Sequence, residues 1–261
     1  MPVRDSYLEG TPSWVDLATT EPEGAKRFYS AMFGWDFTDE EAGGEAVYTM
    51  ATKDGHAAAG MMQQAQEQVD MGLPPMWNTY ITVDDVQATV GRVESAGGRV
   101  MAPVMDVMDA GKMAVVVDPS GAVVCLWEAD QHVGAEIVNE PGAFVWSELQ
   151  TADRDGAAGF FSKLIGWDTG RTDLGPMGDM TLFKVGGQDV ASAMDLPGEG
   201  VPPHWQVYFG VEDCDSACAT ATAHGGRVLA APMDIPPGRM AVLADPAGAV
   251  FSIIAVADQS G

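Results

Sequence analysis

Basic residues are scarce in this chain, and their shortage limits the partners it can have. Thirteen Lys and Arg stand against 38 Asp and Glu, which gives a formal net charge of -25. DNA, RNA and anionic membranes attract proteins through Lys and Arg, so we expect no nucleic-acid and no membrane partner. The sequence also lacks an apolar run of about 18 residues that could cross a bilayer, and residues 1–6 lack the apolar stretch of a signal peptide. We therefore expect a cytoplasmic protein.

Cysteine is scarce too, and several catalytic motifs are missing. The three cysteines, Cys125, Cys214 and Cys218, are too few for a disulfide framework, and no Cys-x-x-Cys pair is present for zinc or redox chemistry. The sequence contains neither the Gly-x-Ser-x-Gly elbow of serine hydrolases nor a phosphate-binding or dinucleotide-binding glycine loop. The composition is that of a globular protein, since 46% of the 261 residues are hydrophobic and 20% are charged. This length predicts one or two domains.

The most informative feature is an internal repeat. Residues 28–35 recur as residues 160–167, residues 97–100 as 225–228, and residues 118–123 as 245–250. A nearly constant separation over several matched blocks indicates a duplicated chain rather than chance similarity. The periodic pattern breaks between residues 130 and 142, so we expect two domains, residues 1–132 and residues 133–261.

Each half also repeats one order of expected elements. Residues 14–19 alternate like a strand, and residues 21–33 have the apolar spacing of a helix that ends at Gly34. Short strands follow, and a second unit begins with a strand at residues 78–83 and a helix that Asp85 caps. The stretch 103–106 predicts a loop. The order is therefore strand, helix and two or three strands, given twice in each half, which predicts an α+β fold.

Three local motifs recur in both halves and carry a family resemblance. They are the helix ending from Phe28 to Trp35, the strand-to-helix junction Val83-Asp84-Asp85, and the hairpin Asp118-Pro119-x-Gly121. This series resembles the vicinal oxygen chelate superfamily of glyoxalases, bleomycin-resistance proteins and extradiol dioxygenases, and it is similar to two-domain actinobacterial members typified by a mycobacterial antigen. The resemblance covers nearly all of the chain. It implies four tandem βαβββ modules that form two glyoxalase-like domains, each with a curled mixed sheet around a cavity.

The resemblance also implies a divalent metal, which the family holds with His or Gln, His and Glu from three strands. In this sequence those positions fall on Trp14, Asn78 and Cys125 in the first half, and on Trp146, Gln206 and Ser252 in the second. Because neither half keeps the ligand set, we expect no metal and no other cofactor. Two residues could restore a site: Glu128, which strand alternation turns away from Cys125, and His204, which shares a face with Gln206.

Strand alternation predicts which side chains share each cavity. The first half would present Trp14, Asp16, Asn78, Tyr80, Cys125 and Trp127, and the second half Trp146, Glu148, Gln206, Tyr208, Ser252 and Ile254. An indole offers a flat stacking surface, so a planar or aromatic small molecule suits this lining. A carboxyl group buried beside an indole has a raised pKa, which makes Asp16 or Glu148 a candidate general base. The candidate hydrogen-bond donors to a developing enolate are Tyr80 and Tyr208, and His204 is a further catalytic candidate.

The sequence leaves three functions open. The first is a protein that binds a small organic molecule in a metal-free cavity, by sequestration or as a metal-independent lyase or isomerase. The second is a metal-dependent glyoxalase or dioxygenase with unconventional ligands, for which His204, Glu148 and Glu128 are the candidates. The third is a non-catalytic scaffold in which Trp14 and Trp146 fill the cavities, with Asp16 and Glu148 hydrogen-bonded as part of the core. Both a monomer and a homodimer remain open.

Overall fold

The computed structural model describes residues 3–41, 47–175 and 178–257, and each half of the chain has the same order of elements. The first half contains β1 (Pro12–Thr19), α1 (Pro22–Phe33), β2 (Asp36–Glu41), β3 (Val47–Lys53), β4 (His56–Gln63), α2 (Gln66–Asp70), β5 (Met76–Thr82), α3 (Val86–Ala96), β6 (Arg99–Val107), β7 (Gly111–Val117) and β8 (Val123–Ala129). The second half contains β9 (Phe144–Gln150), α4 (Arg154–Ile165), β10 (Asp168–Asp173), β11 (Asp179–Val185), β12 (Gln188–Met194), β13 (His204–Gly210), α5 (Cys214–Ala223), β14 (Arg227–Ile235), β15 (Gly238–Ala244) and β16 (Val250–Val256).

Each half forms one eight-stranded mixed sheet. The strand orders are β2-β3-β4-β1-β5-β8-β7-β6 and β10-β11-β12-β9-β13-β16-β15-β14. In the first sheet β1 is parallel to β4 and β5 is parallel to β8, whereas β1 and β5 are antiparallel and join the two modules. The predicted α+β fold of four βαβββ modules is therefore confirmed. The predicted boundary at residues 132 and 133 stays a prediction and lies in the segment between β8 and β9.

The predicted loop at residues 103–106 is wrong, because β6 continues through it. Met105 pairs with Met113 of β7, and the register shifts between Ala102 and Met105, around Pro103. Proline removes one hydrogen bond of a sheet, and an edge strand such as β6 tolerates that loss. The short helix α2 was not predicted either. Among the described residues, no helix is long and apolar enough to cross a membrane.

Repeated residues set the ends of the helices. The side chains of Asp85 and Asp213 each accept a hydrogen bond from the backbone N–H three residues further on, at 2.8 and 2.7 Å. These are N-caps, which satisfy an N–H that the helix leaves unpaired. At the other end, Gly34 and Gly166 both have a φ of 73°, in the left-handed region that favours glycine after a helix. The predicted cap at Asp85 and the predicted helix end at Gly34 are both confirmed.

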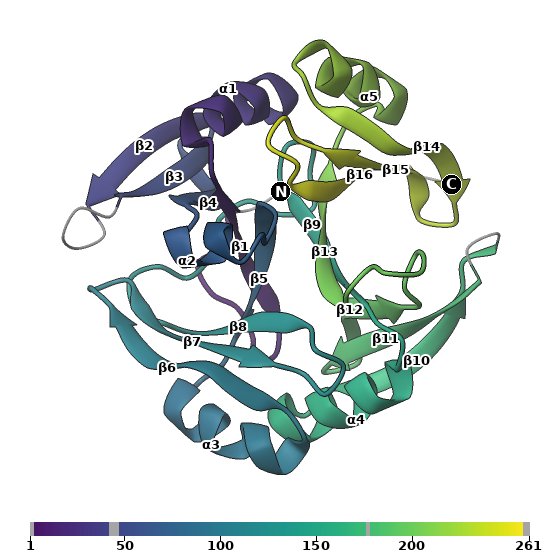
Figure 1. Ribbon diagram of the computed structural model, residues 1–261. Coiled ribbons are helices and arrows are strands. Elements are labelled where there is room, and N and C mark those ends of the chain that lie inside the picture. Colours follow the sequence, from purple (N-terminus) through teal and green to yellow (C-terminus); the bar gives the residue numbers. More distant parts are fainter. Residues whose placement is uncertain (1–2, 42–46, 176–177, 258–261) are drawn as a thin grey trace.

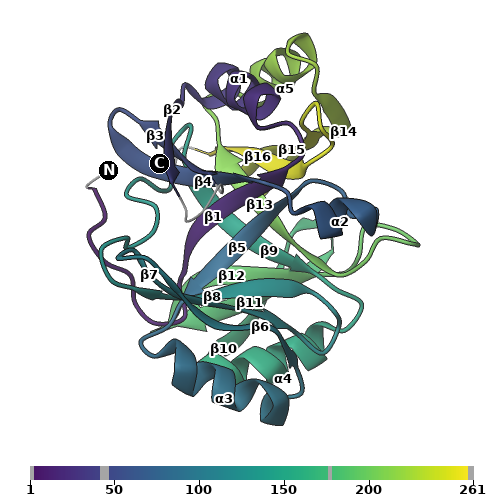
Figure 2. The same cartoon turned by 60° about the vertical axis from the view of Figure 1, so that its left-hand side comes forward.

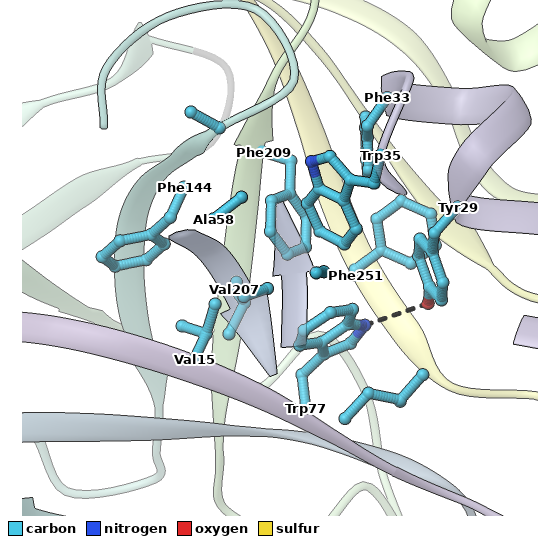
Figure 3. Close-up of a cluster of buried hydrophobic side chains, with 14 of the residues drawn as sticks. Val15, Tyr29, Phe33, Trp35, Ala58, Trp77, Phe144, Val207, Phe209 and Phe251 are labelled. Carbon is cyan, nitrogen blue, oxygen red and sulfur yellow. Dashed lines mark hydrogen bonds between the residues drawn. The ribbon is translucent and has the colours of Figure 1, made fainter. Parts of the chain in front are cut away.

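The two sheets lie back to back, and the two large apolar clusters between them, which together form the shared core, each contain residues of both halves. Helices α1 and α5 lie side by side at one end of the molecule, and α3 and α4 at the other (Figures 1 and 2). Figure 3 shows aromatic side chains of both halves meeting between the sheets, with Trp77 of β5 against Phe209 of β13 at 4.9 Å between ring centroids. The indole of Trp35 donates to the backbone oxygen of Gly142 at 2.7 Å, across the two halves. Because the apolar back of each sheet is covered by the other, neither half has a complete core of its own.

One buried hydroxyl is present in only one of the two repeats. The Tyr29 hydroxyl accepts from the Trp77 indole at 3.0 Å and donates to the Asp245 carboxylate at 3.2 Å. Phe161 stands at the repeat position of Tyr29 and packs edge-on against Trp205, as Tyr29 does against Trp77. In this repeat, two buried polar atoms have no hydrogen-bond partner among the described residues: Nε1 of Trp205 and Oδ2 of Asp118.

We expect Phe161→Tyr to stabilise the protein by about 1 to 2 kcal/mol, because the new hydroxyl can join these two unpaired atoms. The matched substitution Tyr29→Phe removes the same bridge in the other repeat and should cost about 1 to 3 kcal/mol. Urea unfolding of both variants and the wild type measures the two changes. A Phe161→Tyr variant that is no more stable than the wild type would show that the two polar atoms do not lie within reach of the added hydroxyl.

Candidate functional site

The predicted site residues lie on the faces of the two sheets that point away from the shared core, which we call the outer faces. Figure 1 shows each sheet curling away from the other. On β1 the side chain of Val15 points into the shared core, so the alternate residues Trp14 and Asp16 point to the outer face. Between β1 and β5, Trp14 pairs with Tyr80 and Asp16 with Asn78. Between β5 and β8, Tyr80 pairs with Cys125, and Trp127 follows two residues later on the same face. The same pairings recur between β9, β13 and β16.

In the first half, a fully buried carboxylate is surrounded by donors. Asp16 accepts hydrogen bonds from the Tyr80 hydroxyl at 2.7 Å, the Asn78 amide at 2.8 Å and the Tyr48 hydroxyl at 3.2 Å. Burial raises the pKa of Asp16, and the three hydrogen bonds lower it in part. Because all of these donors belong to the protein, the Asp16 carboxylate is already satisfied without a ligand.

Aromatic rings close the first half over Asp16. Trp14 is 3% exposed, and its indole donates to the Tyr48 hydroxyl at 2.8 Å. The ring of His132, from the segment that connects the two halves, packs edge-on against Trp14 at 4.4 Å, and its backbone oxygen accepts from the Trp127 indole at 2.9 Å. Sequence reasoning missed both Tyr48 and His132. The closed arrangement matches the third function left open by the sequence, in which an indole fills the cavity.

A steric fit explains why Tyr48 can reach Asp16. A Cβ atom on Gly60 would lie 1.9 Å from the Tyr48 hydroxyl, so this hydroxyl occupies space that only glycine leaves free. Gly60 is the strand partner of Asp16, and Ser192 is the corresponding partner of Glu148. The second half therefore has a side chain where the first half has none.

In the second half the carboxylate is held differently. Glu148 is 3% exposed, and its Oε1 accepts from the Tyr208 hydroxyl at 3.0 Å and the Gln150 amide at 2.5 Å. From the described residues its Oε2 accepts a single long hydrogen bond, from Ser192 at 3.3 Å. Burial raises the pKa of Glu148 to about 7, against the lowering effect of these three donors. This carboxyl group can therefore both take up and return a proton near neutral pH.

The indole beside Glu148 is more open than its counterpart in the first half. Trp146 is half-buried, and its indole N–H donates to Ser192 at 2.8 Å. Gln206 does not bind the carboxylate as Asn78 does; its amide donates to the Ser252 hydroxyl at 3.0 Å. Two small apolar clusters belong to this half, one of Leu174, Met180 and Met194 and one of Tyr208, Met240 and Ile254. Sequence reasoning missed Gln150 and Ser192, which complete the polar network.

Glu128 and His204, the two residues that could restore a metal site, either lie on the other face of the sheet or have another partner. Glu128 forms an ion pair with Lys112 at 2.7 Å and accepts from the backbone of Val86 at 2.9 Å. It lies on the face opposite Cys125, as strand alternation predicts. His204 does lie on the outer face, opposite Gln150, but its Nδ1 is 2.9 Å from the backbone oxygen of Pro202.

The residues at the family's metal positions do not fit a divalent cation. An indole ring is not a metal ligand, and the amide nitrogens of Asn78 and Gln206 are turned toward Asp16 and Ser252. Within the described ranges, no three His, Cys, Asp or Glu side chains are grouped so as to hold a metal. We therefore derive no chemistry through a metal.

A cavity of about 390 Å³ and a smaller one of about 190 Å³ lie in the described part of the chain. Both lie beside the end of β8, and neither is lined by a residue of the Asp16 or Glu148 clusters. Neither cavity therefore belongs to the outer face of the second half.

Comparisons with known proteins place this geometry in a family. Residues 11–126 match the family model of the Glyoxalase/Bleomycin resistance protein/Dioxygenase superfamily, and residues 146–254 match a glyoxalase-like domain. The chain is 46% identical over 261 residues to a Mycobacterium bovis protein with the provisional name glyoxylase CFP32, covering 99% of this chain and 100% of that protein. It is 36% identical over 262 residues to the anthracycline biosynthesis protein DnrV of Streptomyces peucetius, covering 95% and 94%.

Solved structures agree on the fold. The Mn(II)-bound glyoxalase of Novosphingobium aromaticivorans superposes with a TM-score of 0.65 at 16% identity, over 95% of this chain and 83% of that one. The 2,3-dioxygenase LapB of Pseudomonas sp. KL28 superposes with a TM-score of 0.66 at 15% identity, over 95% and 93%. Sequence identities this low show that the fold is shared and do not show a shared activity. The family-model matches and the full-length mycobacterial relative show that the chain belongs to the glyoxalase, bleomycin-resistance protein and dioxygenase superfamily.

Proposed function

We propose that the outer face of the second half binds a planar organic molecule, and that Glu148 exchanges a proton with it. The observation that carries this proposal is the difference between the two halves. Asp16 is enclosed by Trp14, Tyr48 and protein donors, whereas Glu148 lies beside a half-buried Trp146 and has one oxygen with a single long hydrogen bond. The first half then serves as a closed structural copy, and the second half is the functional one.

The surroundings of Glu148 suit a flat ligand. The indole N–H of Trp146 donates to Ser192, which fixes the ring, and because the ring is only half-buried, part of its surface is open for stacking. Apolar side chains such as Met180 and Met240 can cover the rest of a ring system, and thioethers adapt to different shapes. The name of the Streptomyces peucetius relative refers to anthracycline biosynthesis, and anthracyclines are planar polycyclic molecules, which supports a ligand of this shape.

Proton exchange follows from the position of the carboxylate. Oε2 of Glu148 can take a proton from a ligand carbon next to a carbonyl group, and the electron pair of the broken C–H bond moves to the carbonyl oxygen as an enolate. Once Oε2 of Glu148 is protonated, Oε1 is neutral and a weaker acceptor, so the Tyr208 hydroxyl can turn from it and donate to the enolate oxygen. Return of the proton at another carbon gives an isomerase. Without a reactive C–H bond the same site sequesters the ligand.

Fluorescence titration with 2,6-dihydroxyanthraquinone, a planar probe, tests the binding site. We expect the probe to quench tryptophan fluorescence in the wild type, and its Kd to rise at least about tenfold in Trp146→Ala, because the stacking surface is lost. The control is Tyr80→Phe, which removes a hydroxyl from the closed first half and should leave the Kd unchanged. An unchanged Kd in Trp146→Ala, with a folded variant by circular dichroism, would refute the assignment of the second half.

A further inference from the structure

Resting on the proposed function, we infer that Gln206 selects ligands that donate a hydrogen bond at their edge. The Gln206 amide donates through Nε2 to the Ser252 hydroxyl at 3.0 Å. Ser252 is the strand partner of Tyr208, whose hydroxyl donates to Glu148 at 3.0 Å. Both hydrogen bonds lie on the same face of the sheet as the carboxylate.

The hydrogen bond from Gln206 to Ser252 fixes which end of the Gln206 amide remains for a ligand. The amide nitrogen donates to the Ser252 hydroxyl, so the carbonyl oxygen is the end that remains, and it accepts no hydrogen bond from the described residues. A carbonyl oxygen accepts hydrogen bonds and cannot donate them, so it pairs with an O–H or N–H group of a ligand.

Gln206 and Glu148 each have an acceptor oxygen on the outer face. Gln206 is the direct strand partner of Glu148, and the Cβ atoms of such a pair are about 5 Å apart. Within the described ranges, Oε2 of Glu148 accepts just the 3.3 Å hydrogen bond from Ser192. A ligand edge with a hydroxyl or N–H group satisfies these oxygens, whereas an edge with only carbonyl or ether oxygens places acceptor against acceptor.

The first half lacks this arrangement. Asn78, at the position of Gln206, donates directly to Asp16 at 2.8 Å, and Cys125 takes the place of Ser252. The amide of Asn78 is thus bound to a carboxylate that two tyrosine hydroxyls also satisfy, in the half that aromatic rings close. We therefore assign the selectivity to the second half.

A pair of probes that differ only in their donors tests the inference. The first is 2,6-dihydroxyanthraquinone, and the second is 2,6-dimethoxyanthraquinone, which has the same ring system without O–H groups. We expect the wild type to bind the dihydroxy probe at least about tenfold more tightly, as one well-placed hydrogen bond gives. Gln206→Met keeps the length of the side chain without its oxygen, and the preference should fall below about threefold.

Two further variants make the result interpretable. Ser252→Ala frees the amide to turn and should also reduce the preference, with less change to the volume of the site. Gln188→Met makes the same exchange at an exposed position of β12 and should keep the full preference. Equal affinity of the wild type for both probes, or a full preference in folded Gln206→Met, would overturn this inference while leaving the proposed function standing. If neither probe bound the wild type, the proposed function itself would fail.

Discussion

Replacing Gly60 by Ser is expected to lower the free energy of unfolding by about 3 to 5 kcal/mol, because the new Cβ atom overlaps the Tyr48 hydroxyl in a packed interior. That Cβ would lie 1.9 Å from the hydroxyl oxygen. Moving Tyr48 breaks its hydrogen bonds to Trp14 and Asp16, which are both buried. The loss therefore combines overpacking with unpaired polar groups.

The double variant Tyr48→Met with Gly60→Ser should recover most of this loss. It copies the second half, where Ser192 stands at the position of Gly60 and Met180 at that of Tyr48. Urea unfolding of the two single variants and the double variant gives their coupling energy. Additive losses in the double variant would contradict the steric explanation of why one half is closed and the other open.

The second large effect concerns pH. We expect Glu148→Gln to stabilise the protein at pH 8 by about 3 kcal/mol and to change its stability little at pH 4. A pKa raised by burial from 4.5 to about 7 means that ionising Glu148 opposes folding. The corresponding free energy is about 1.4 kcal/mol for each tenfold change in acidity, so roughly 3 kcal/mol in all.

The sign follows from proton binding. Between pH 4.5 and about 7 the native state holds the proton of Glu148 while the unfolded state has lost it, so stability falls as the pH rises through this range. The pKa of Asp16 is also raised by burial, but that residue is present in both proteins, so the difference between them isolates Glu148. Urea unfolding at several pH values measures this difference. If the free energies of unfolding of the wild type and the variant differed by the same amount at every pH, the raised pKa of Glu148 would be contradicted.

Much of the fold could be predicted from the sequence, because the repeat gives two independent views of one pattern. The blocks at residues 28–35 and 160–167 indicate the same helix end twice, and alternation along β1, β5 and β8 places Asp16 with Asn78 and Tyr80. Strand alternation fixes which face a residue occupies, even when the pairing of strands is unknown. The hydrogen bonds from Tyr80 to Asp16 and from Tyr208 to Glu148 agree with that parity.

The difference between the halves could not be predicted in this way. Tyr48 reaches Asp16 from β3, which is two strands away from β1, and only the register of β3 and β4 places it there. His132 lies in a connecting segment without periodicity. The sequence does not show that Gly60 leaves room for another side chain, because the neighbouring side chain is known only from the structure. The paired Trp14 and Trp146 therefore looked equivalent in sequence, although one is enclosed and the other half-buried.

Native mass spectrometry of the gently purified protein with added 2,6-dihydroxyanthraquinone tests the central claim most directly, because it weighs bound metal and bound ligand together. Our account predicts one probe molecule per chain, no stoichiometric metal, and loss of the complex in Trp146→Ala. Two probe molecules per chain would contradict a closed first half, and a complex that persists in Trp146→Ala would contradict the second-half site. One transition-metal ion per chain would contradict the metal-free account and favour a metal-dependent member of the superfamily.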